Sequence, residues 1–408
     1  MEPRRAVVVG AGVVGLSCAW FLQEHGIEVT VLDRSGVGAG ASWGNAGYLA
    51  PAMTVPLAEP SMLREGARGV FARHSPLAVS ARGLLGSLPF LVGFARNATT
   101  TSWRRGLDAL SVLSASCIDA FDELAANGVA VQTARTAVRI GLPPGASTAA
   151  LEHEFAAVRA AGIPAGFTTG AVAAPFSDRI GRVLVLNGQR HLDPGAFVRA
   201  LADAIVARGG TIVDGARVRK VAYGPSGLQV DTWADTPFPA DAVVLATGAW
   251  LPDLAGPLGV RVPVQAGRGY SCSVGIDRPL ETPVYLSGIR VAVTPYRGRA
   301  RLAGTMEIAA PDAPFDPRRL QAIIRSARPF LTGLDWDDVT DPWVGPRPLT
   351  PDGLPLIGAT ALPGVHVAGG HGMWGLTLGP ITGKLLAEQI VKGQDLPQLA
   401  PFAPTRRA

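Results

Sequence analysis

Hydrophobic residues at the start of the chain predict a strand, a helix and a second strand in close succession. Residues 5–9 form an almost wholly apolar, β-branched run, which is typical of a parallel strand covered on both faces. A helix is expected to follow Gly12 and to end near His25, because Gly26 comes next. Residues 27–32 then predict a second apolar strand, and the whole forms a βαβ unit of roughly thirty residues.

The next part of the chain predicts a long loop, two helices and a group of strands. Residues 35–60 are rich in Gly, Ala, Ser and Pro without a sustained period, so we expect an extended functional loop. Helical patterns cover residues 84–95 and 103–127, and Gly128 ends the second of them. A strand-rich insert is expected after this helix.

A βαβ-like pattern then returns in the middle of the chain. Pro194 begins a helix that we expect to reach Arg208. A strand at residues 211–213 and a buried strand at residues 241–246 follow it. These strands are expected to join the sheet begun by the first residues, which makes that domain discontinuous.

The last third of the chain predicts one more set of strands and two helices. Residues 252–338 mix short strands with turns and contain an amphipathic helix at residues 318–330. A strand at residues 365–368 and a helix at residues 378–391 complete the pattern. We expect this final pair to belong to the first domain.

These patterns predict an α/β protein with a Rossmann-like dinucleotide-binding domain and an interleaved α+β domain, built on a mixed sheet, for the substrate. The dinucleotide-binding domain is expected to comprise residues 1–80, 185–250 and 340–408. The substrate or cap domain is expected to comprise residues 81–184 and 251–339. A chain of 408 residues, 48% of them hydrophobic, is too long for one compact core and too apolar for disorder.

The charge pattern argues against nucleic acid as a partner. There are 37 basic and 32 acidic residues, and the resulting net charge of +5 is spread along the chain without a basic block. The three cysteines, Cys18, Cys117 and Cys272, lack the spacing of a metal site or a disulfide framework. A reducing, cytoplasmic compartment fits this cysteine usage best.

Two apolar segments raise the question of membrane contact. Residues 6–22 are uncharged, but as a helix they would reach only about 25 Å, short of a hydrocarbon core of about 30 Å. Residues 83–95 are also uncharged and lie between Arg82 and Arg96. They could rest on the inner face of the membrane, where a quinone could be met, but could not span it. Ordinary core packing is the alternative.

Three glycines between the first strand and its helix predict a dinucleotide site. Gly10, Gly12 and Gly15 form a G-x-G-x-x-G motif, in which we expect the first to make a tight turn. The second leaves room for a pyrophosphate, and the third allows the helix to approach the sheet. Asp33 ends the second strand, where its carboxylate can accept hydrogen bonds from ribose hydroxyls.

A second glycine-rich loop near the end of the chain favours FAD over NAD. Residues 369–375 contain four glycines and His371, and they precede a predicted helix. A helix N-terminus directed at a flavin pyrimidine ring would stabilise the negative charge that develops there on reduction. The first domain is therefore predicted to bind FAD.

Four ordered motifs carry a family resemblance that covers nearly the whole chain. They are the opening glycine motif, the loop at residues 42–47, the Trp343–Gly358 segment that reads WVGPRPLTPDGLPLIG, and Gly370-His371-Gly372. Together they resemble the D-amino-acid oxidase superfamily of FAD-dependent amine oxidoreductases. Within it, the chain is most similar to the bacterial D-amino-acid dehydrogenases, whose R-H-x-P-L-A pattern has a counterpart at residues 73–78.

The resemblance implies a set of cofactor contacts and of substrate contacts. The residues expected to contact FAD are Gly10, Gly12, Val14, Gly15, Asp33, Arg34, Ser42, Asn45, Ala46, Gly47, Val218, Thr247, Gly248, Gly370, Gly372, Met373, Gly375, Leu376 and Thr377. The residues expected at the reaction centre are Arg347, Tyr270, Tyr48 and His371. Arg347 would bind the substrate carboxylate through its planar fork of donors. Tyr270 could add a hydroxyl donor to the same carboxylate, and Tyr48 could line the pocket.

Departures from the family pattern refine these expectations. All three cysteines precede the C-terminal region where sarcosine oxidase relatives attach their flavin, so FAD is expected to be noncovalent. Met373 and Trp374 are larger than the residues typical of D-amino-acid dehydrogenases after this histidine, which leaves the size of the substrate pocket open.

The expected reaction is oxidative deamination of a D-amino acid, or of a cyclic amino acid such as a D-proline derivative, by hydride transfer from the α carbon to flavin N5. The electron acceptor could be a quinone or oxygen. A glycine- or sarcosine-type amine oxidase that uses oxygen and a noncatalytic flavin-binding subunit stay open as alternatives.

Overall fold

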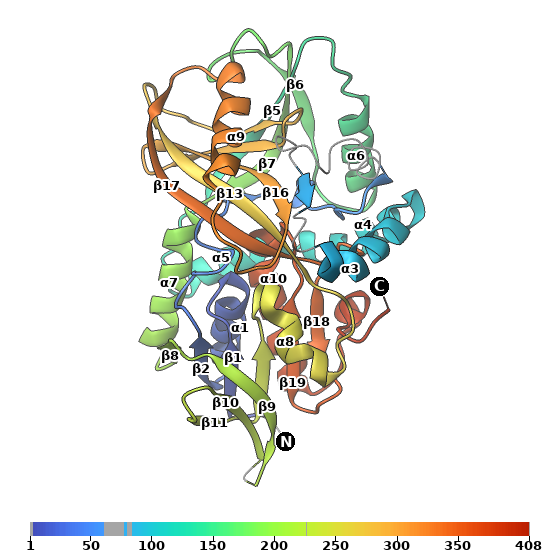
Figure 1. Cartoon of the computed structure of the whole chain (residues 1–408), viewed down its shortest axis with the longest axis vertical. Coiled ribbons are helices and arrows are strands. Elements are labelled where there is room, and N and C mark those ends of the chain that lie inside the picture. The colour runs from blue at the N-terminus through green and yellow to red at the C-terminus, as the bar shows by residue number, and fades with distance from the viewer. Residues whose placement is uncertain (1–2, 61–76, 80–83, 226, 408) are drawn as a thin grey trace.

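The computed structural model of the protein describes residues 3–60, 77–79, 84–225 and 227–407, and their strands form three sheets (Figure 1). The first is six-stranded, in the order β18-β19-β12-β1-β2-β8, and every neighbouring pair is parallel except β18 and β19. Its strands are β1 (Arg5–Val9), β2 (Glu28–Asp33), β8 (Thr211–Asp214), β12 (Ala242–Leu245), β18 (Leu356–Ala359) and β19 (Val365–Gly369).

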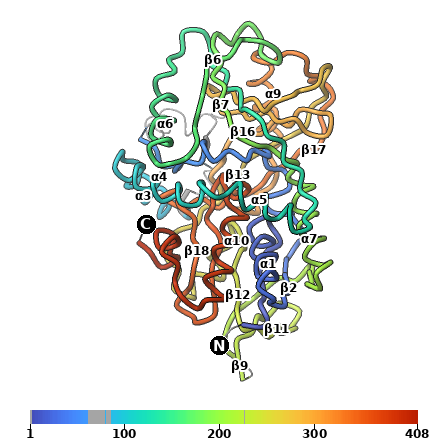
Figure 2. Tube along the Cα trace, turned by 180° about the vertical axis from the view of Figure 1, so that it is seen from behind, coloured from blue at the N-terminus to red at the C-terminus, as the bar shows by residue number. Residues whose placement is uncertain are grey.

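Both faces of this parallel sheet are covered, which explains the unbroken apolar runs of its strands. Ala6 and Val8 of β1 face the helical layer, whereas Val7 and Val9 face the three-stranded sheet on the other side. The helical layer consists mainly of α1 (Val13–Glu24), α7 (Pro194–Ala207) and α10 (Gly375–Lys392), with α4 (Thr100–Ser114) and α5 (Cys117–Ala126) beside it. Seen from behind, α5 lies along the junction between the two halves of the molecule (Figure 2).

Helices α1 and α10 approach each other closely because α10 presents two glycines to α1. A Cβ atom on Gly383 would lie 2.5 Å from the backbone carbon of Ser17 in α1. One turn earlier, a Cβ atom on Gly379 would lie 3.3 Å from Val13. The C-terminal helix is therefore fixed directly against the helix that follows the first glycine motif.

A small antiparallel sheet closes the other face of the parallel sheet. It has the order β11-β10-β9, formed by β9 (Val218–Gly224), β10 (Gly227–Thr232) and β11 (Pro237–Pro239). Val221, Leu228 and Val230 of this sheet pack against β1 and β12, together with residues from α8 (Leu251–Ala255).

The second half of the molecule is built on a larger, mixed sheet of the order β17-β13-β16-β15-β14-β5-β7-β3, to which β4 and β6 also pair. Its strands are β3 (Tyr48–Leu49), β4 (Leu77–Val79), β5 (Ala134–Leu142), β6 (Phe167–Gly170), β7 (Arg182–His191), β13 (Gln265–Ile276), β14 (Val284–Leu286), β15 (Val291–Tyr296), β16 (Arg299–Ile308) and β17 (Leu334–Leu349). The helices α9 (Pro317–Ala327) and α6 (Ala149–Ala160) pack on this sheet through separate cores, and α3 (Leu84–Asn97) lies beside it. Short 3-10 turns complete the chain at Pro51–Met53, Gly248–Trp250, Gly256–Leu258, Arg328–Phe330 and Pro397–Phe402.

The predicted fold class, a Rossmann-like α/β domain with an interleaved mixed-sheet domain, is confirmed. Two strands of the larger sheet extend into ranges that the sequence predicts for the dinucleotide-binding domain. Most of β7 falls within residues 185–250, and much of β17 follows position 340. The domain boundaries given above stay a prediction.

Three element predictions need correction. The helix expected at residues 103–127 is two helices, because serines at 111, 114 and 116 compete for backbone hydrogen bonds; the Ser111 hydroxyl, for example, donates to the Asp108 carbonyl. Helix α10 begins at Gly375, three residues before the expected start. The loop expected at residues 35–60 contains a short strand, β3, and one 3-10 turn. Residues 73–76 of the family pattern lie outside the described residues.

Candidate active site

A cavity of about 390 Å³ lies where the carboxyl ends of β1, β2 and β12 meet the end of β17. Both glycine-rich loops contribute to its wall, although more than 350 residues separate them in the sequence. The carboxyl edge of a parallel sheet is the usual position of a nucleotide site in this type of fold. The cavity therefore joins the two motifs that the sequence singled out.

Each glycine of the first motif is required for a different reason. Gly10 has φ +114°, a conformation that suits glycine. Gly12 has φ −78° and ψ 174°, which any residue can adopt, and a Cβ atom there would meet only the Ser42 hydroxyl, at 3.3 Å. A side chain on Gly12 would thus enter the cavity, whereas a Cβ atom on Gly15 would lie 1.9 Å from the Gly10 carbonyl oxygen. Gly12 leaves space for a ligand, and Gly15 allows the close contact of helix and strand.

Most of the expected cofactor residues line the cavity. Those that do are Gly10, Gly12, Val14, Asp33, Arg34, Ser42, Asn45, Val218, Thr247, Gly248, Gly372, Gly375 and Leu376. Arg347 and His371, from the expected reaction centre, line it too. The cavity is not lined by Gly15, Ala46, Gly47, Gly370, Met373 or Thr377. Thr377, for example, donates its hydroxyl to the Tyr48 carbonyl, and Met373 packs in an apolar cluster with Leu349.

The Asp33 carboxylate holds the turn as well as lining the cavity. It accepts hydrogen bonds from the backbone N–H groups of Ala11, at 2.8 Å, and of Ser35 and Gly36. A carboxylate has about four lone-pair positions, so room is left for one more donor such as a ribose hydroxyl. Asp33 therefore fits a nucleotide, and it also fixes the loop that surrounds the nucleotide.

Two tryptophan–arginine pairs at the same end of the cavity were not expected from the sequence. The Arg34 guanidinium lies 3.7 Å from the centre of a Trp250 ring, and Asp312 accepts hydrogen bonds from both side chains. Arg217 lies 5.6 Å from a ring of Trp233, whose side chain is 62% exposed. All four residues line the cavity. Of these four, only Arg34 is among the residues that the sequence predicts to contact FAD, because the pairs form only when distant segments meet.

The loop at residues 42–47 connects the two halves of the molecule. The Ser42 hydroxyl accepts a hydrogen bond from the Val13 N–H at the start of α1. On the other side, Ser271 of the larger sheet donates its hydroxyl to the Gly44 carbonyl, at 2.7 Å. The hydroxyl of Thr294 binds the carbonyl of Ala46 in the same way. This loop thus fixes the position of the cavity relative to the larger sheet.

The second glycine loop brings a helix N-terminus and a buried histidine to the cavity. Helix α10 begins at Gly375, so its free N–H groups and partial positive charge lie at the wall. His371 is only 3% exposed; its Nε2 contacts the Thr382 hydroxyl at 2.9 Å, and burial lowers its pKa to about 3. The imidazole is therefore neutral near pH 7.

The wall of the cavity also fits a cofactor rich in hydrogen-bonding groups. His371 Nδ1 and the Thr247 hydroxyl are both buried, and neither has a hydrogen-bond partner among the residues described. Buried polar groups normally have partners, and a flavin offers carbonyl and N–H groups around its ring. The open Gly12 backbone, the α1 N-terminus and these two side chains together fit FAD.

Arg347 is a half-buried cation without an acidic partner among the described residues. Its guanidinium makes one long hydrogen bond, from Nη1 to the Thr305 carbonyl at 3.4 Å, and no carboxylate lies within ion-pair distance in the described part of the chain. Burial lowers its pKa to about 10, so it is still charged at neutral pH. The guanidinium stands in the space left by Gly269, where a Cβ atom would lie 2.0 Å from its central carbon. It is open to an anion from the cavity side.

The structure does not bring Tyr270 or Tyr48 to Arg347. Strand β13 pairs Gly267 with Arg347 and Tyr270 with Val344, so Arg347 and Tyr270 lie on opposite faces of the sheet. The Tyr270 hydroxyl donates to Glu307 at 2.9 Å. Tyr48 donates its hydroxyl to the Val284 carbonyl at 2.6 Å, within the larger sheet. The sequence placed these tyrosines near a motif, but strand pairing decides which face each of them occupies.

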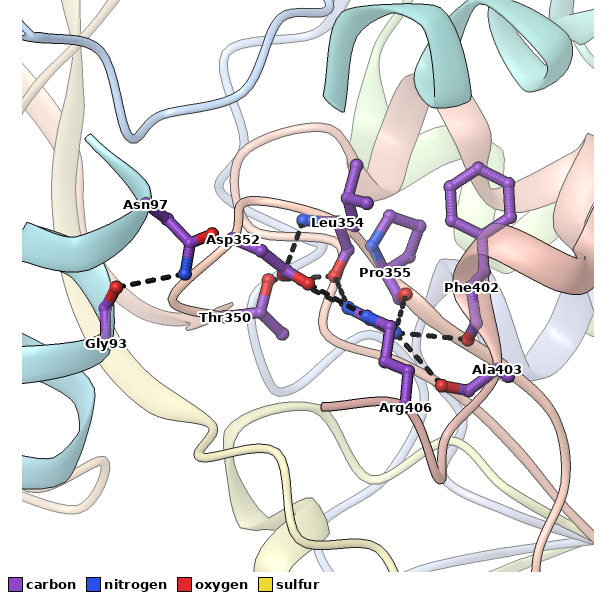
Figure 3. Close-up of polar contacts among 9 residues, drawn as sticks. All are labelled: Gly93, Asn97, Thr350, Asp352, Leu354, Pro355, Phe402, Ala403 and Arg406. Atoms are coloured by element: carbon purple, nitrogen blue, oxygen red, sulfur yellow. Dashed lines mark hydrogen bonds and ion pairs between the residues drawn. The ribbon is translucent and has the colours of Figure 1, made fainter. Parts of the chain in front are cut away.

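The turn that follows Arg347 is fixed by the C-terminus (Figure 3). Arg406 forms two hydrogen bonds with the Asp352 carboxylate, at 2.8 and 3.1 Å, and also donates to the carbonyls of Leu354 and Pro355. Both side chains of this ion pair are only 13% exposed. The end of the chain thus holds the end of β17 in place.

The fold and the cavity define a dinucleotide-binding protein whose site is shared between a parallel sheet and a larger mixed sheet. The chain belongs to the FAD dependent oxidoreductase (DAO) family, and the sequence model of this family matches residues 5–389. It is an FAD-dependent oxidoreductase that acts on amino acids, and both predictions, of the cofactor and of the enzyme class, are confirmed.

Relatives and solved structures agree with this assignment. The chain is 31% identical to D-amino acid dehydrogenases from two strains of Cereibacter sphaeroides, over 99% of its own length and 97% of theirs. Its fold is similar to that of glycine oxidase from Geobacillus kaustophilus, with a TM-score of 0.75 at 22% identity, over 99% of this chain and all of that one. It is also similar to L-α-glycerophosphate oxidase from Mycoplasma pneumoniae with FAD bound, with a TM-score of 0.71 at 16% identity, over 100% and 99% of the two chains.

Proposed function

We propose that this protein oxidises the α-amino group of D-amino acids, or of a cyclic amino acid such as a D-proline derivative, and that Arg347 binds the carboxylate of the substrate. The observation that carries the proposal is the half-buried Arg347 guanidinium at the wall of the cofactor cavity, which has no acidic partner among the described residues. A charge that is partly removed from water without a counterion is costly, so the arginine is ready to bind an anion. The D-amino acid dehydrogenases at 31% identity support the choice of substrate.

The side chains around the cavity would orient the substrate and the cofactor without a dedicated base. Arg347 would hold the carboxylate, and the neutral His371 would present its free Nδ1 to the cofactor. Bound FAD supplies the oxidation by accepting a hydride from the α carbon. The resulting imine is hydrolysed by water to a 2-oxo acid and ammonia, or is retained when the amine belongs to a ring.

The same proposal assigns the cavity wall to FAD. The turn at Gly10, Gly12 and the start of α1 would hold the pyrophosphate, and Asp33 would bind the adenosine ribose. The residues at the N-terminus of α10 would lie near the pyrimidine ring. None of the three cysteines lines the cavity, which supports noncovalent binding.

An anaerobic titration tests the substrate. The purified yellow protein is mixed with D- and L-amino acids, proline derivatives, glycine and sarcosine, and the flavin absorbance is followed. We expect D-amino acids to reduce the flavin and L-amino acids to leave it oxidised. Reduction by glycine or sarcosine alone would favour an amine oxidase, and no reduction by any amine would leave only a flavin-binding role. Reoxidation by oxygen or by a soluble quinone then identifies the electron acceptor.

A peripheral membrane contact through α3 is part of the proposal, since a quinone acceptor would be met there. In the described chain, no helix is long and apolar enough to cross a membrane. Leu88 and Val92 lie one turn apart on α3 and are 44% and 47% exposed, and Arg96 lies in the last turn of the helix. Flotation with anionic liposomes tests the contact. The wild type should co-float and the double variant Leu88→Gln, Val92→Gln should not; a wild type that stays below the liposomes would contradict it.

A further inference from the structure

A bulge in β16 directs an unusual threonine toward Arg347. Strand β13 pairs Arg268 with Glu307 and Tyr270 with Gly304, so Gly269 alone lies opposite two residues, Thr305 and Met306. Bulges of this kind bend a strand and turn its side chains, and they are frequent beside active sites. Because Gly269 is also the residue over which the Arg347 guanidinium lies, the bulge and the guanidinium occupy the same place on the sheet.

The face of the sheet that Thr305 and Met306 occupy follows from their neighbours. Before the bulge, Arg301 of β16 binds Ser271, which lies on the face of β13 that also carries Gly269. Thr305 lies four positions after Arg301, so the alternation of side chains places it on this same face. Met306 is the second residue of the bulge, and its sulfur lies 3.2 Å from the Cβ position of Gly267, the residue paired with Arg347. Both side chains therefore lie on the face of the sheet that carries the guanidinium.

Thr305 adopts a conformation that its side chain disfavours. Its φ is +50°, which is rare for a β-branched residue and is found mainly where function requires it. Its hydroxyl is buried and has no hydrogen-bond partner in the part of the chain that the structure describes. Its carbonyl, in contrast, accepts the hydrogen bond from Arg347 Nη1. The backbone is thus strained at the one residue that already holds the guanidinium, while the hydroxyl beside it is unused.

We propose that the Thr305 hydroxyl is the second group that binds the substrate carboxylate, in the role that the sequence suggested for Tyr270. The carbonyl and hydroxyl oxygens of one threonine lie a few bonds apart, so an anion on the Arg347 guanidinium is within reach of the hydroxyl. The residue is half-buried, and one χ1 rotation exchanges the positions of its hydroxyl and methyl groups. The assignment rests on the proposed function, because it needs a carboxylate at Arg347.

Thr305→Val tests the hydroxyl while keeping the branched shape and the strained backbone. Benzoate and benzamide, which differ only in the carboxylate, are titrated against the FAD-loaded protein by the change in flavin absorbance. A hydrogen bond to a charged group predicts about 10- to 100-fold weaker binding of benzoate by the variant, with benzamide changed less than about threefold. In stopped-flow reduction by a D-amino acid, the apparent Kd should rise by the same factor while the limiting rate changes little.

Two further substitutions separate binding from structure. Thr305→Ser keeps the hydroxyl and should bind benzoate within about threefold of the wild type. Thr305→Gly removes the hydroxyl but relieves the strain, so its Tm should rise while its benzoate affinity falls. If Thr305 had only a structural role, the Tm and the benzoate affinity of Thr305→Gly would both rise or both fall. Thr169→Val, at an exposed position in β6, is the matched control and should change neither.

The outcomes distinguish this proposal from the proposed function. Benzoate binding by Thr305→Val at wild-type strength, or a wild type that binds benzoate no better than benzamide, would overturn the role of Thr305. Failure of every amino acid to reduce the wild-type flavin would overturn the proposed function instead. In that case the benzoate titration still reports on Thr305, because it needs no turnover.

Discussion

Gly269 shows how a residue without a side chain can form a substrate site. The Arg347 guanidinium fills the space above it, and a Cβ atom there would lie 2.0 to 2.1 Å from three guanidinium atoms. Contacts this short force the arginine to move, since the interior around it is closely packed. The position of Arg347 thus depends on a glycine in a different strand, which no sequence motif marks.

We predict that Gly269→Ala weakens substrate binding at least about tenfold without loss of FAD, because the displaced guanidinium can no longer pair with the carboxylate. The apparent Kd for a reducing D-amino acid and the flavin content of the purified protein are the measurements. Gly166→Ala is the control, since in the described structure no atom other than those of Gly166 and its two chain neighbours lies within 4 Å of the Cβ position there. A Gly269→Ala variant with wild-type affinity would show that Arg347 does not bind the substrate from this position.

Some site residues could be predicted from the sequence, and others could not. Arg347 was found because a local motif surrounds it, and Gly12 and Asp33 because a fixed spacing connects them. Tyr270 was predicted from proximity to a motif, but the pairing of β13 with β17 places its hydroxyl on the face opposite Arg347. Thr305 had no signal, because its importance comes from a bulge that forms only when β16 meets β13.

At the scale of secondary structure, the β1–α1 turn must leave space for a ligand and must also let the helix pack closely on the strand. Gly12 has ordinary backbone angles and open space beside it, whereas Gly15 contacts the Gly10 carbonyl. The two positions should therefore respond differently to the same change. Propensity alone treats both as poor helix residues and does not separate them.

We predict that Gly12→Val folds but is colourless, because its side chain enters the space of the pyrophosphate. Gly15→Val should instead lower the free energy of unfolding by about 3 kcal/mol or more, because overpacking separates α1 from the sheet. Flavin absorbance and urea unfolding monitored by circular dichroism measure the two effects. Full FAD content in Gly12→Val would contradict the assignment of this turn to the cofactor.

Elements with a regular hydrophobic period, or with a residue that ends a helix, can be predicted from the sequence. Examples are α1, which ends before Gly26, and the amphipathic α9. The break between α4 and α5 was missed because the apolar period continues across residues 115–116. Strand β3 was missed because two residues carry no pattern, and only their pairing with β7 makes them a strand. Local sequence does not report such long-range pairing.

At the scale of the whole molecule, two histidines with lowered pKa values, the half-buried His366 and the buried His371, predict how stability depends on pH. Burial lowers the pKa of His366 to about 4 and that of His371 to about 3, from an ordinary value of 6.5. The folded protein thus binds fewer protons than the unfolded chain in this range, so stability falls as the pH decreases from 6.5 toward 4. His366→Asn should flatten this dependence by at most about 1.4 kcal/mol per pH unit. Urea unfolding at several pH values measures it, and an unchanged slope would contradict the burial of a neutral His366.

The C-terminal ion pair gives a prediction for the molecule as a whole. Arg406→Ala leaves the buried Asp352 carboxylate without its cation, so we expect a loss of about 3 kcal/mol in the free energy of unfolding. The apparent affinity for the substrate should also fall, because the turn after Arg347 is released. Arg407→Ala, at the exposed neighbouring position, is the control and should be within about 0.5 kcal/mol of the wild type.

The distance in the sequence between the two glycine-rich loops has a consequence for synthesis on the ribosome. The first glycine turn leaves the exit tunnel more than 350 residues before β19 and the N-terminus of α10, although both line the same cavity. A nascent chain therefore carries an incomplete flavin site until the second loop has emerged. We expect a chain that is truncated before Gly369 to be released without flavin, which its absorbance would show.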